Sequence, residues 1–358
     1  MSDSGIDILL HNHLDGSRPM LDILPYLFYL THGTKKNYPF DQWRNHHEQI
    51  KKWFANPLKE DIVHKFSVTT GVMQNYDTIY FSSKNYVETR AYQGFKYCEI
   101  IMAPQYCTFL GLTIEEAILA MVMGIIHGEI EYPDIEVNIL LAVGREVEPE
   151  KAVELVESFA NFKKNYPRYS SYIAGVTLVC DEAKYPPQRH IQMFKRAKEL
   201  SFKTACHTGE WVNHENQEPD FKRDLPLLLE NCWTSVEDLR VDRIEHGRPI
   251  AYDEKLIKVL HERNIGVTSC PGSYICSGLL PDNNVEVLKL TELLGADVLL
   301  TIDSDDDLFM DDIDEVFNRC NSYYHFTEEQ KLKLRLNAWK IKFGNRKVHD
   351  MNPPRGKP

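Results

Sequence analysis

The sequence predicts an α/β protein whose eight parallel strands close into a (β/α)8 TIM-type barrel. Three observations support this fold class. Short apolar runs alternate with helical patterns along most of the chain. The runs number eight, which is the strand count of such a barrel. Each run is apolar almost throughout rather than at every second residue, as expected for a parallel sheet that is covered on both faces.

In chain order, the expected strands span residues 6–16, 95–105, 137–145, 173–182, 203–210, 241–247, 265–273 and 298–307. Between them, segments such as 149–165 and 253–264 carry apolar residues at i, i+3, i+4 and i+7, which predicts amphipathic helices. The longest apolar run, 117–126, is about half as long as a membrane span and has glutamates on both sides. We therefore expect it to be a buried helix.

The chain of 358 residues fits one large barrel domain, which we place at residues 1–348. The long connection at about 20–93, which includes the helix-like stretch 41–54, is expected to be a helical insertion. Connections that follow barrel strands build the active-site face, so this insertion is expected to act as a lid or pocket wall. Residues 349–358 resemble a disordered tail.

Composition narrows the classes of partner. The formal net charge of −12 argues against nucleic acid or an anionic membrane, because both repel a negative surface. Eight scattered cysteines without a CxxC pair suggest reduced thiols, and the amino terminus lacks the pattern of a secretion signal. These features predict a cytoplasmic protein. They leave its oligomeric state open.

Polar residues follow the strands where each strand ends, and in a barrel all of these carboxyl ends meet at one mouth. The residues are His11-Asn12-His13, His207-Thr208-Gly209-Glu210, Glu245-His246-Gly247, Cys270-Pro271 and Asp303-Ser304-Asp305-Asp306-Asp307. Burying such groups is costly unless they are paired or bind a metal ion. His11 and His13 also point to the same side of their strand, since strand side chains alternate.

Three histidines and one carboxylate from these ends form a ligand set that suits zinc and leaves room for a water molecule: His11, His13, His207 and Asp305. Zinc would lower the pKa of that water toward about 7. His246, on the neighbouring strand, is placed to accept the proton, and Glu210 is placed to supply one as a general acid.

These residues also have other interpretations. Alone, a His-x-His pair is more often a pair of core residues, and an acidic run can begin a helix. The run from Asp303 is no calcium loop, because its sixth and twelfth positions are Leu308 and Asp314. No GxGxxG, P-loop, GxSxG or HExxH motif is present. We expect His127-Gly128-Glu129 to end an apolar helix, and the following histidines to lie on the surface: His32, His64, His190, His214, His261, His325 and His349.

The motifs HNHLDGS, HTGE, RIEHG and DSDDD, in this order, resemble those of the adenosine deaminase family within the amidohydrolase superfamily. The stretches FKYCEIIMAPQ, VTLVCDE and SCPGS resemble the second, fourth and seventh strands of that family, and the similarity extends from about residue 6 to residue 343. The resemblance implies a (β/α)8 barrel with one divalent metal, usually zinc. It also implies an aminohydrolase that converts adenosine or deoxyadenosine to inosine or deoxyinosine and ammonia.

Carried over to this sequence, the resemblance assigns the metal to His11, His13, His207 and Asp305, and catalysis to Glu210, His246 and Asp305. Glu210 would protonate purine N1, and His246 would orient and deprotonate the attacking water. Asp306 would bond to N7, and Asp15 would reach the ribose hydroxyl. The positions expected to face the substrate are His13, Asp15, Cys180, Gly209 and Asp306.

Three residues depart from the family pattern. Thr208 replaces an alanine, Cys180 replaces a glycine beside the purine, and Asp307 replaces a proline and would add a carboxylate near the site. The substrate therefore stays open between adenosine, deoxyadenosine, free adenine and another 6-aminopurine, with a phosphorylated purine disfavoured by the acidic mouth. Two alternatives are a same-fold deaminase of another amino-heterocycle and a catalytically silent binding protein. Lys203 opens its strand rather than closing it, which favours one metal over two.

Overall fold

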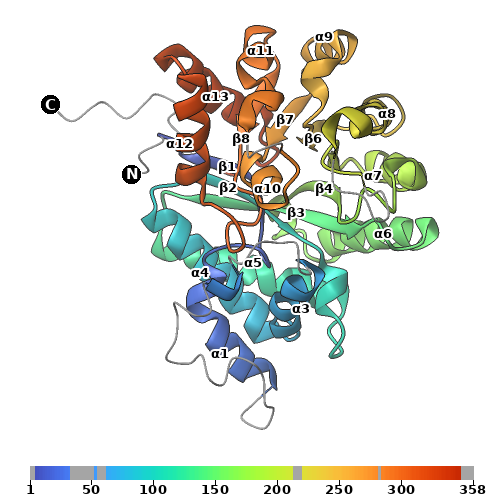
Figure 1. Ribbon diagram of the computed structural model, residues 1–358. Coiled ribbons are helices and arrows are strands. Elements are labelled where there is room, and N and C mark those ends of the chain that lie inside the picture. The colour runs from blue at the N-terminus through green and yellow to red at the C-terminus, as the bar shows by residue number, and fades with distance from the viewer. Residues whose placement is uncertain (1–4, 33–51, 55–61, 213–219, 281–283, 348–358) are drawn as a thin grey trace, which may run out of the picture.

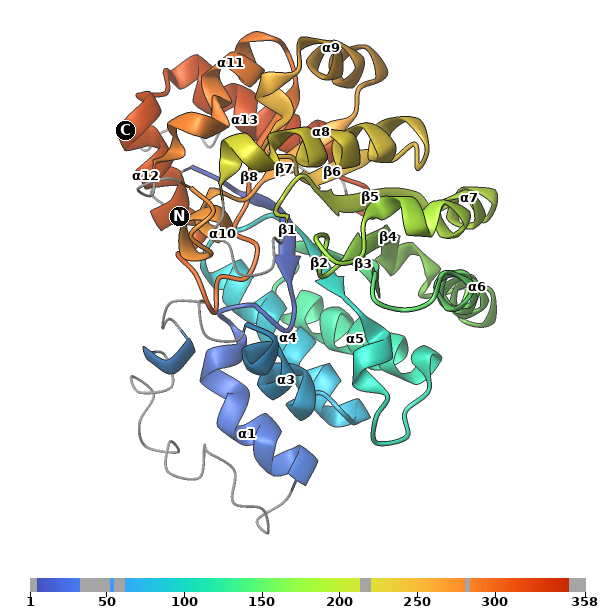
Figure 2. The same cartoon turned by 45° about the vertical axis from the view of Figure 1, so that its right-hand side comes forward.

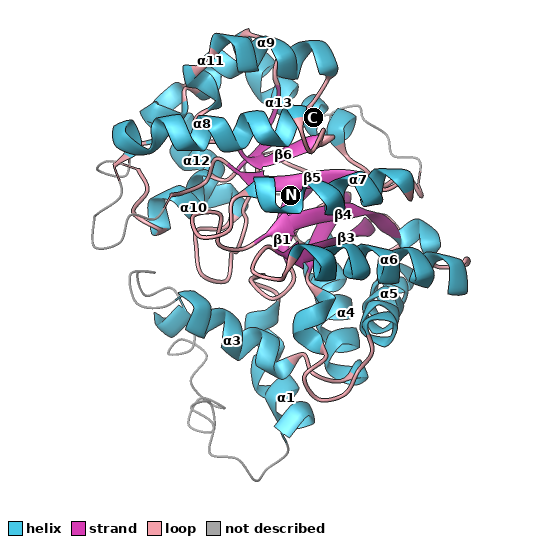
Figure 3. Cartoon of the chain, turned by 90° about the vertical axis from the view of Figure 1, so that its right-hand side faces the viewer, coloured by secondary structure: helices cyan, strands magenta, loops and turns pink. Residues whose placement is uncertain are grey.

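The computed structural model describes residues 5–32, 52–54, 62–212, 220–280 and 284–347. Eight parallel strands form one sheet in which each strand pairs with the next in sequence, and helices surround the sheet (Figures 1 and 3). The strands are β1 (Ile8–His13), β2 (Tyr97–Met102), β3 (Glu136–Gly144), β4 (Ile173–Val179), β5 (Lys203–Thr208), β6 (Arg243–His246), β7 (Gly266–Ser269) and β8 (Leu299–Ile302). All eight expected strands are present, which confirms the predicted barrel fold.

The first and last strands meet through a short contact rather than a full ladder. Asn12 and Asp305 form an isolated parallel bridge, in which Asp305 N donates to His11 O at 3.0 Å and His13 N donates to Asp305 O at 3.4 Å. Nearby, the Asp303 carboxylate accepts hydrogen bonds from the backbone N–H groups of Leu10 and His11, at 2.7 and 3.1 Å. The seam between β8 and β1 is thus closed beside the polar residues of the mouth.

The helices outside the insertion are α5 (Ile114–Glu131), α6 (Pro149–Asn165), α7 (Ile191–Glu199), α8 (Phe221–Glu237), α9 (Glu254–Arg263), α10 (Pro271–Cys276), α11 (Leu290–Gly295), α12 (Ile313–Tyr324) and α13 (Glu328–Ile341). The expected helices at 149–165 and 253–264 are α6 and α9. Pro149 occupies the first position of α6, where its missing N–H costs nothing, and the Asp253 side chain caps α9.

The connection between β1 and β2 contains α1 (Met20–His32), α3 (Ile62–Val72) and α4 (Tyr76–Tyr92), which lie together on one side of the sheet (Figures 1 and 2). This insertion contacts the loop after β8, because the rings of Phe54 and Phe66 lie 5.6 and 4.9 Å from that of Phe309. Most of the expected 41–54 helix, His214, His349 and the expected tail at 349–358 fall outside the described residues.

One expectation about the histidines is wrong. His190 is fully buried, and its Nε2 lies 2.9 Å from Arg145 O, so it is an interior residue rather than a surface one. His127 lies near the end of α5, which ends at Glu131, two residues beyond the expected end at Glu129, and its Nδ1 is 2.6 Å from the Tyr80 hydroxyl. The run 117–126 lies in this same helix, and most residues of the run are buried as expected. Among the described residues, no helix is long and apolar enough to cross a membrane.

Candidate active site

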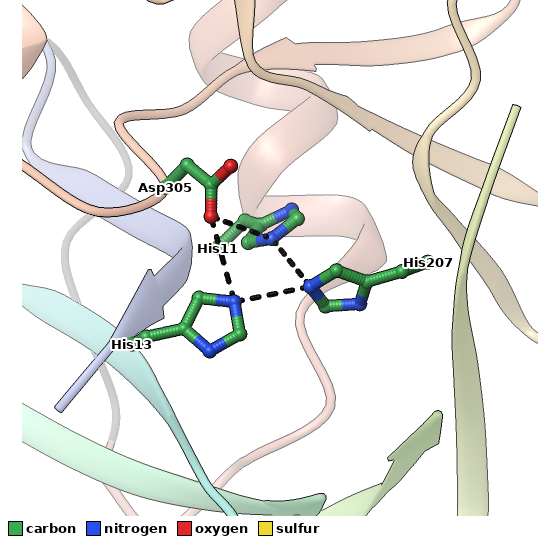
Figure 4. Close-up of side chains that lie close together, drawn as sticks. All are labelled: His11, His13, His207 and Asp305. Carbon is green, nitrogen blue, oxygen red and sulfur yellow. Dashed lines mark hydrogen bonds and ion pairs between the residues drawn. The ribbon is translucent and has the colours of Figure 1, made fainter. Parts of the chain in front are cut away.

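Four potential metal ligands converge at the mouth of the barrel from three strands or the loops that follow them: His11, His13, His207 and Asp305 (Figure 4). The Nε2 atoms of His11 and His13 lie 3.1 and 3.0 Å from that of His207. Oδ1 of Asp305 lies 3.5 and 3.4 Å from the same two atoms of His11 and His13. The structure therefore brings together all four residues that the sequence analysis placed on the metal.

The spacing of these atoms fits a small divalent cation. A tetrahedral zinc site with bonds of 2.0–2.1 Å has edges of about 3.3 Å between its ligand atoms. On the far side of the rings, His11 Nδ1 lies 3.2 Å from Thr268 Oγ1, and His207 Nδ1 lies 2.8 Å from Glu245 Oε2. An oxygen atom close to each Nδ1 favours the proton on that nitrogen, and the Nε2 lone pairs are then free to face a metal ion.

Burial favours neutral imidazoles at this position. It lowers the pKa of His11 and His207 well below the usual value, and the neighbouring histidines lower it further. Burial likewise lowers the pKa of His13 to about 4. Neutral rings are the form that binds metal ions, and a cation would in turn stabilise the buried carboxylate of Asp305.

A buried ion network inside the barrel supports His207. Oε1 of Glu245 lies 3.2 Å from an Arg243 nitrogen, and its Oε2 accepts a hydrogen bond from Thr177 Oγ1 at 2.5 Å. Arg243 also binds Glu99 at 2.7 Å, and all three charged side chains are fully buried. Glu245 was expected at a strand end, but no role was predicted for it. Charged residues within the otherwise apolar strand of "RIEHG" were the sequence feature that could have indicated a buried ion network.

The two expected proton-transfer residues lie beside the metal ligands. His246 Nε2 is 3.5 Å from Glu210 Oε2 and 4.0 Å from Asp305 Oδ2, and Ser273 Oγ donates to Glu210 Oε1 at 3.1 Å. Burial raises the pKa of Glu210 to about 7 and lowers that of His246 to about 4. Near neutral pH, a protonated carboxyl group and a neutral imidazole can therefore coexist.

Glu182 holds the turn that carries Glu210. Its carboxylate accepts hydrogen bonds from Gly209 N at 2.8 Å, Glu210 N at 2.9 Å and Asn231 Nδ2 at 2.8 Å. It also accepts a bond from Thr208 Oγ1 at 3.3 Å, which is a contact that alanine could not make. No role was predicted for Glu182, although the acidic pair Asp181-Glu182 directly after the apolar run "VTLVC" was a usable signal.

Asp306 is buried on the other side of the cluster, and its Oδ1 has no hydrogen-bond partner among the described residues. A Cβ atom on Gly16 would lie 1.7 Å from this oxygen, so the glycine of "LDGS" leaves room for it. Asp15, one residue earlier, is half-buried, and burial raises its pKa to about 6. Both carboxyl groups are thus available to a bound molecule.

Cys180 follows β4 at the same mouth and is the exposed member of the eight free cysteines. Its φ of 77° is in the left-handed region that glycine adopts freely. The departure from glycine thus retains the glycine-like backbone and adds a thiol, whose Sγ lies 3.5 Å from the Tyr106 hydroxyl.

Asp307 was expected to add a carboxylate near the site, but its charge is paired inside the protein. It is fully buried, and Nη2 of Arg90 lies 2.9 and 2.8 Å from its two oxygens. The backbone N–H of Arg18 and the Asn12 amide also donate to its Oδ1, at 3.0 and 3.1 Å. Arg90 is the partner that the sequence analysis lacked, and it comes from helix α4 of the insertion.

A second possible donor group shares Asp305 and adds His246 and Cys270. Cys270 Sγ lies 3.4 Å from His11 Nδ1, on the side of the ring away from Nε2. The first group has four donors, and three of them are imidazoles with matched Nε2 atoms. It is therefore the better site for a divalent metal.

A family model described as adenosine deaminase matches residues 7–350. An adenosine deaminase from Clostridium kluyveri is 26% identical over 94% of this chain and 89% of its own, and an adenine deaminase from Psychrobacter cryohalolentis is 25% identical over 93% and 91%. Among solved structures, an adenine deaminase from Arthrobacter aurescens gives a TM-score of 0.75 at 19% identity, with 95% of this chain and 94% of the other covered. An amidohydrolase from Burkholderia ambifaria with bound zinc gives a TM-score of 0.76 at 20% identity, and the match covers 96% of this chain and 87% of the other. A complex described as containing IMP gives a TM-score of 0.74 at 18% identity, and the match covers 96% of this chain and 93% of the other.

Proposed function

Because this chain belongs to the adenosine deaminase family, a family of hydrolytic aminohydrolases, we propose that it removes the 6-amino group of adenosine or deoxyadenosine with one zinc ion. One observation carries the proposal. Four ligand atoms for a divalent metal converge beside a half-buried Glu210 and a buried His246, so a metal site and two proton-transfer groups share one mouth. We propose His11, His13, His207 and Asp305 as the ligands.

The bound metal would supply a Lewis acid that makes a water molecule reactive near neutral pH. His246 orients this water and accepts its proton, and its neutral ring suits that role. Glu210, whose pKa is raised by burial, donates a proton to N1 of the purine, which makes C6 electrophilic. The water oxygen then bonds to C6, the bond from C6 to the amino nitrogen breaks, and the proton held by His246 leaves with ammonia. The proton that remains on the C6 oxygen returns to the Glu210 carboxylate, which forms the 6-oxo group and restores the acid.

The remaining polar groups are assigned to substrate orientation. Oδ1 of Asp306, which has no hydrogen-bond partner in the described part of the chain, is assigned to N7, and Asp15 is assigned to a ribose hydroxyl. Gly209 and His13 line the same space, and Cys180 occupies the rim where its thiol can touch the purine edge or the sugar. These assignments account for polar side chains that the metal and the proton transfers leave unused.

A nucleoside suits this mouth better than a nucleotide. Asp15, Asp306 and Glu210 surround the site, whereas the nearby Arg18 is already paired with Asp312. A phosphate group would therefore meet negative charge. Free adenine is the second candidate, because the chain is about equally similar to an adenosine deaminase and to an adenine deaminase.

The test is an ultraviolet assay of the purified, zinc-loaded chain with adenosine, deoxyadenosine, adenine and AMP. We expect adenosine to give inosine, and Glu210→Gln to lower kcat by about 10²–10⁴ while the protein stays folded. Glu129→Gln is the matched control, because it removes a buried carboxylate away from the site and should keep its activity.

Each result of this assay decides between the candidates. Turnover of adenine alone would replace the nucleoside assignment with the base. Turnover of AMP would contradict the role given to the acidic mouth. If no aminopurine reacts although one metal ion is bound per chain, the deaminase assignment is wrong, and a deaminase of another amino-heterocycle or a silent binding protein replaces it.

A further inference from the structure

The ion pair between Arg90 and Asp307 is not used by the proposed chemistry. The two residues are 217 positions apart, and their side chains are 1% and 0% exposed. Removing two charges from water costs free energy that their mutual attraction often does not offset. A buried ion pair is therefore weak evidence for a purely stabilising role. What the pair contacts therefore matters more than the attraction within it.

The contact is Asn12, the residue between the two histidines of β1. Arg90 Nη2 donates to Asn12 Oδ1 at 3.0 Å, which fixes the orientation of the amide. The Asn12 amide nitrogen then donates to Asp307 Oδ1 at 3.1 Å and to the backbone oxygen of Asp305 at 2.6 Å. Because strand side chains alternate, Asn12 faces away from the space that His11 and His13 share.

The cluster of Arg90, Asn12 and Asp307 lies across the seam between β8 and β1. The seam itself consists of few backbone hydrogen bonds, and Asp305 has a φ of 58°, a left-handed conformation that non-glycine residues rarely adopt. Such a conformation persists only where the surroundings hold it. The proposed metal ligands of β1 and the loop after β8 thus depend on contacts across this seam.

We propose that Arg90, Asn12 and Asp307 are positioning residues that hold His11, His13 and Asp305 at the spacing the metal requires. Helix α4 of the insertion, which supplies Arg90, thereby sets the affinity of the site for its metal. The inference rests on the proposed ligand set. It assigns a role to the aspartate that departs from the family pattern, and a second role to the insertion that was expected to act as a lid or pocket wall.

The experiment measures zinc affinity by chelator competition on the full-length chain, together with the rate at which the zinc-loaded protein releases the ion. We expect Arg90→Met and Asp307→Asn each to weaken zinc binding about 10- to 100-fold, the range typical for partners that orient metal ligands. Because both residues act through one cluster, the double variant should lose less than the product of the single losses. Arg90→Lys keeps the positive charge but loses the planar guanidinium group, so its zinc affinity should lie between those of the wild type and Arg90→Met.

The matched control is the ion pair of Arg346 and Glu129, which is also largely buried, with 11% and 6% of the side chains exposed. Arg346→Met should lower the midpoint of thermal unfolding but leave the zinc dissociation constant unchanged. If Arg90→Met does not fold, Asp307→Asn and Arg90→Lys carry the test. Folded variants that bind and release zinc as the wild type does would overturn the inference.

This measurement is separable from the deaminase assay. If the wild type binds one zinc ion and deaminates no aminopurine, the proposed activity fails, while the affinities of the variants still decide the positioning role. If His13→Ala leaves zinc binding unchanged, the ligand set is wrong and both proposals fall.

Discussion

At the scale of single residues, Glu182 is the carboxylate that holds the turn leading to the proposed general acid, Glu210. Its carboxylate, which is 1% exposed, receives the N–H groups of Gly209 and Glu210. Those groups belong to a sharp turn in which Gly209 has a φ of 70°. The turn decides where the Glu210 side chain points, so the position of the proposed acid depends on Glu182.

We therefore expect Glu182→Gln to lower kcat about 10- to 100-fold, because an amide places an N–H group against the donors of the turn and misplaces Glu210. KM for adenosine should change only a few-fold, and the bound metal should remain. Steady-state kinetics with metal analysis would check this. A kcat equal to that of the wild type, or an equal loss in Glu129→Gln, would show that Glu182 has no specific link to Glu210.

At the scale of elements, the strands could be predicted because a strand that is buried on both faces of a parallel sheet has a continuous run of apolar residues. Every expected strand appears, and α6 has the predicted bounds. The partner of Asp307 could not be predicted from local sequence, since Arg90 lies on a helix far away in the sequence and meets Asp307 only when the chain is folded. His190 was misplaced for the same reason: the polar "PPQRH" stretch resembles a surface loop, yet it folds against Arg145.

His190 should make the stability of the fold depend on pH. Burial lowers its pKa, and its Nδ1 has no hydrogen-bond partner among the described residues, so a second proton would be unsatisfied. The unfolded chain binds this proton more readily than the folded chain does. The contribution of His190 is therefore present above its ordinary pKa of about 6.5 and is lost as the pH falls below that value.

We expect the free energy of unfolding of the wild type to decrease between pH 7.5 and pH 5.5 by more than that of His190→Gln, which cannot take up the proton. Urea titrations of both proteins at the two pH values would measure the difference. His261→Gln is the control, because His261 is exposed. Equal pH dependence in the wild type and His190→Gln would contradict this account of the buried ring.

At the scale of the whole molecule, the proposed metal ligands come from distant parts of the barrel. His11 and His13 belong to β1, His207 belongs to β5, and Asp305 follows β8. The local sequence predicted this set because each ligand stands at a strand end, and the topology of the barrel alone brings those ends together. The supporting ion network could not be predicted in this way, since it depends on which side chains meet inside the closed sheet. The central residue of this network is Arg243, whose Cζ lies 4.3 Å from the centroid of the Phe343 ring.

A metal ion that joins β1, β5 and the loop after β8 should stabilise the folded chain as a whole. A ligand present at about 1,000 times its dissociation constant adds about 4 kcal/mol to the free energy of unfolding. For a chain of this size, that corresponds to a rise of about 5 °C in the unfolding midpoint. We therefore expect removal of the metal by a chelator to lower the midpoint by several degrees and readdition of zinc to restore it. Calorimetry of the wild type and of Asp305→Asn would test this, because the variant lacks one ligand and should respond weakly to zinc. A wild-type midpoint that does not depend on zinc would argue against a metal bound across the barrel.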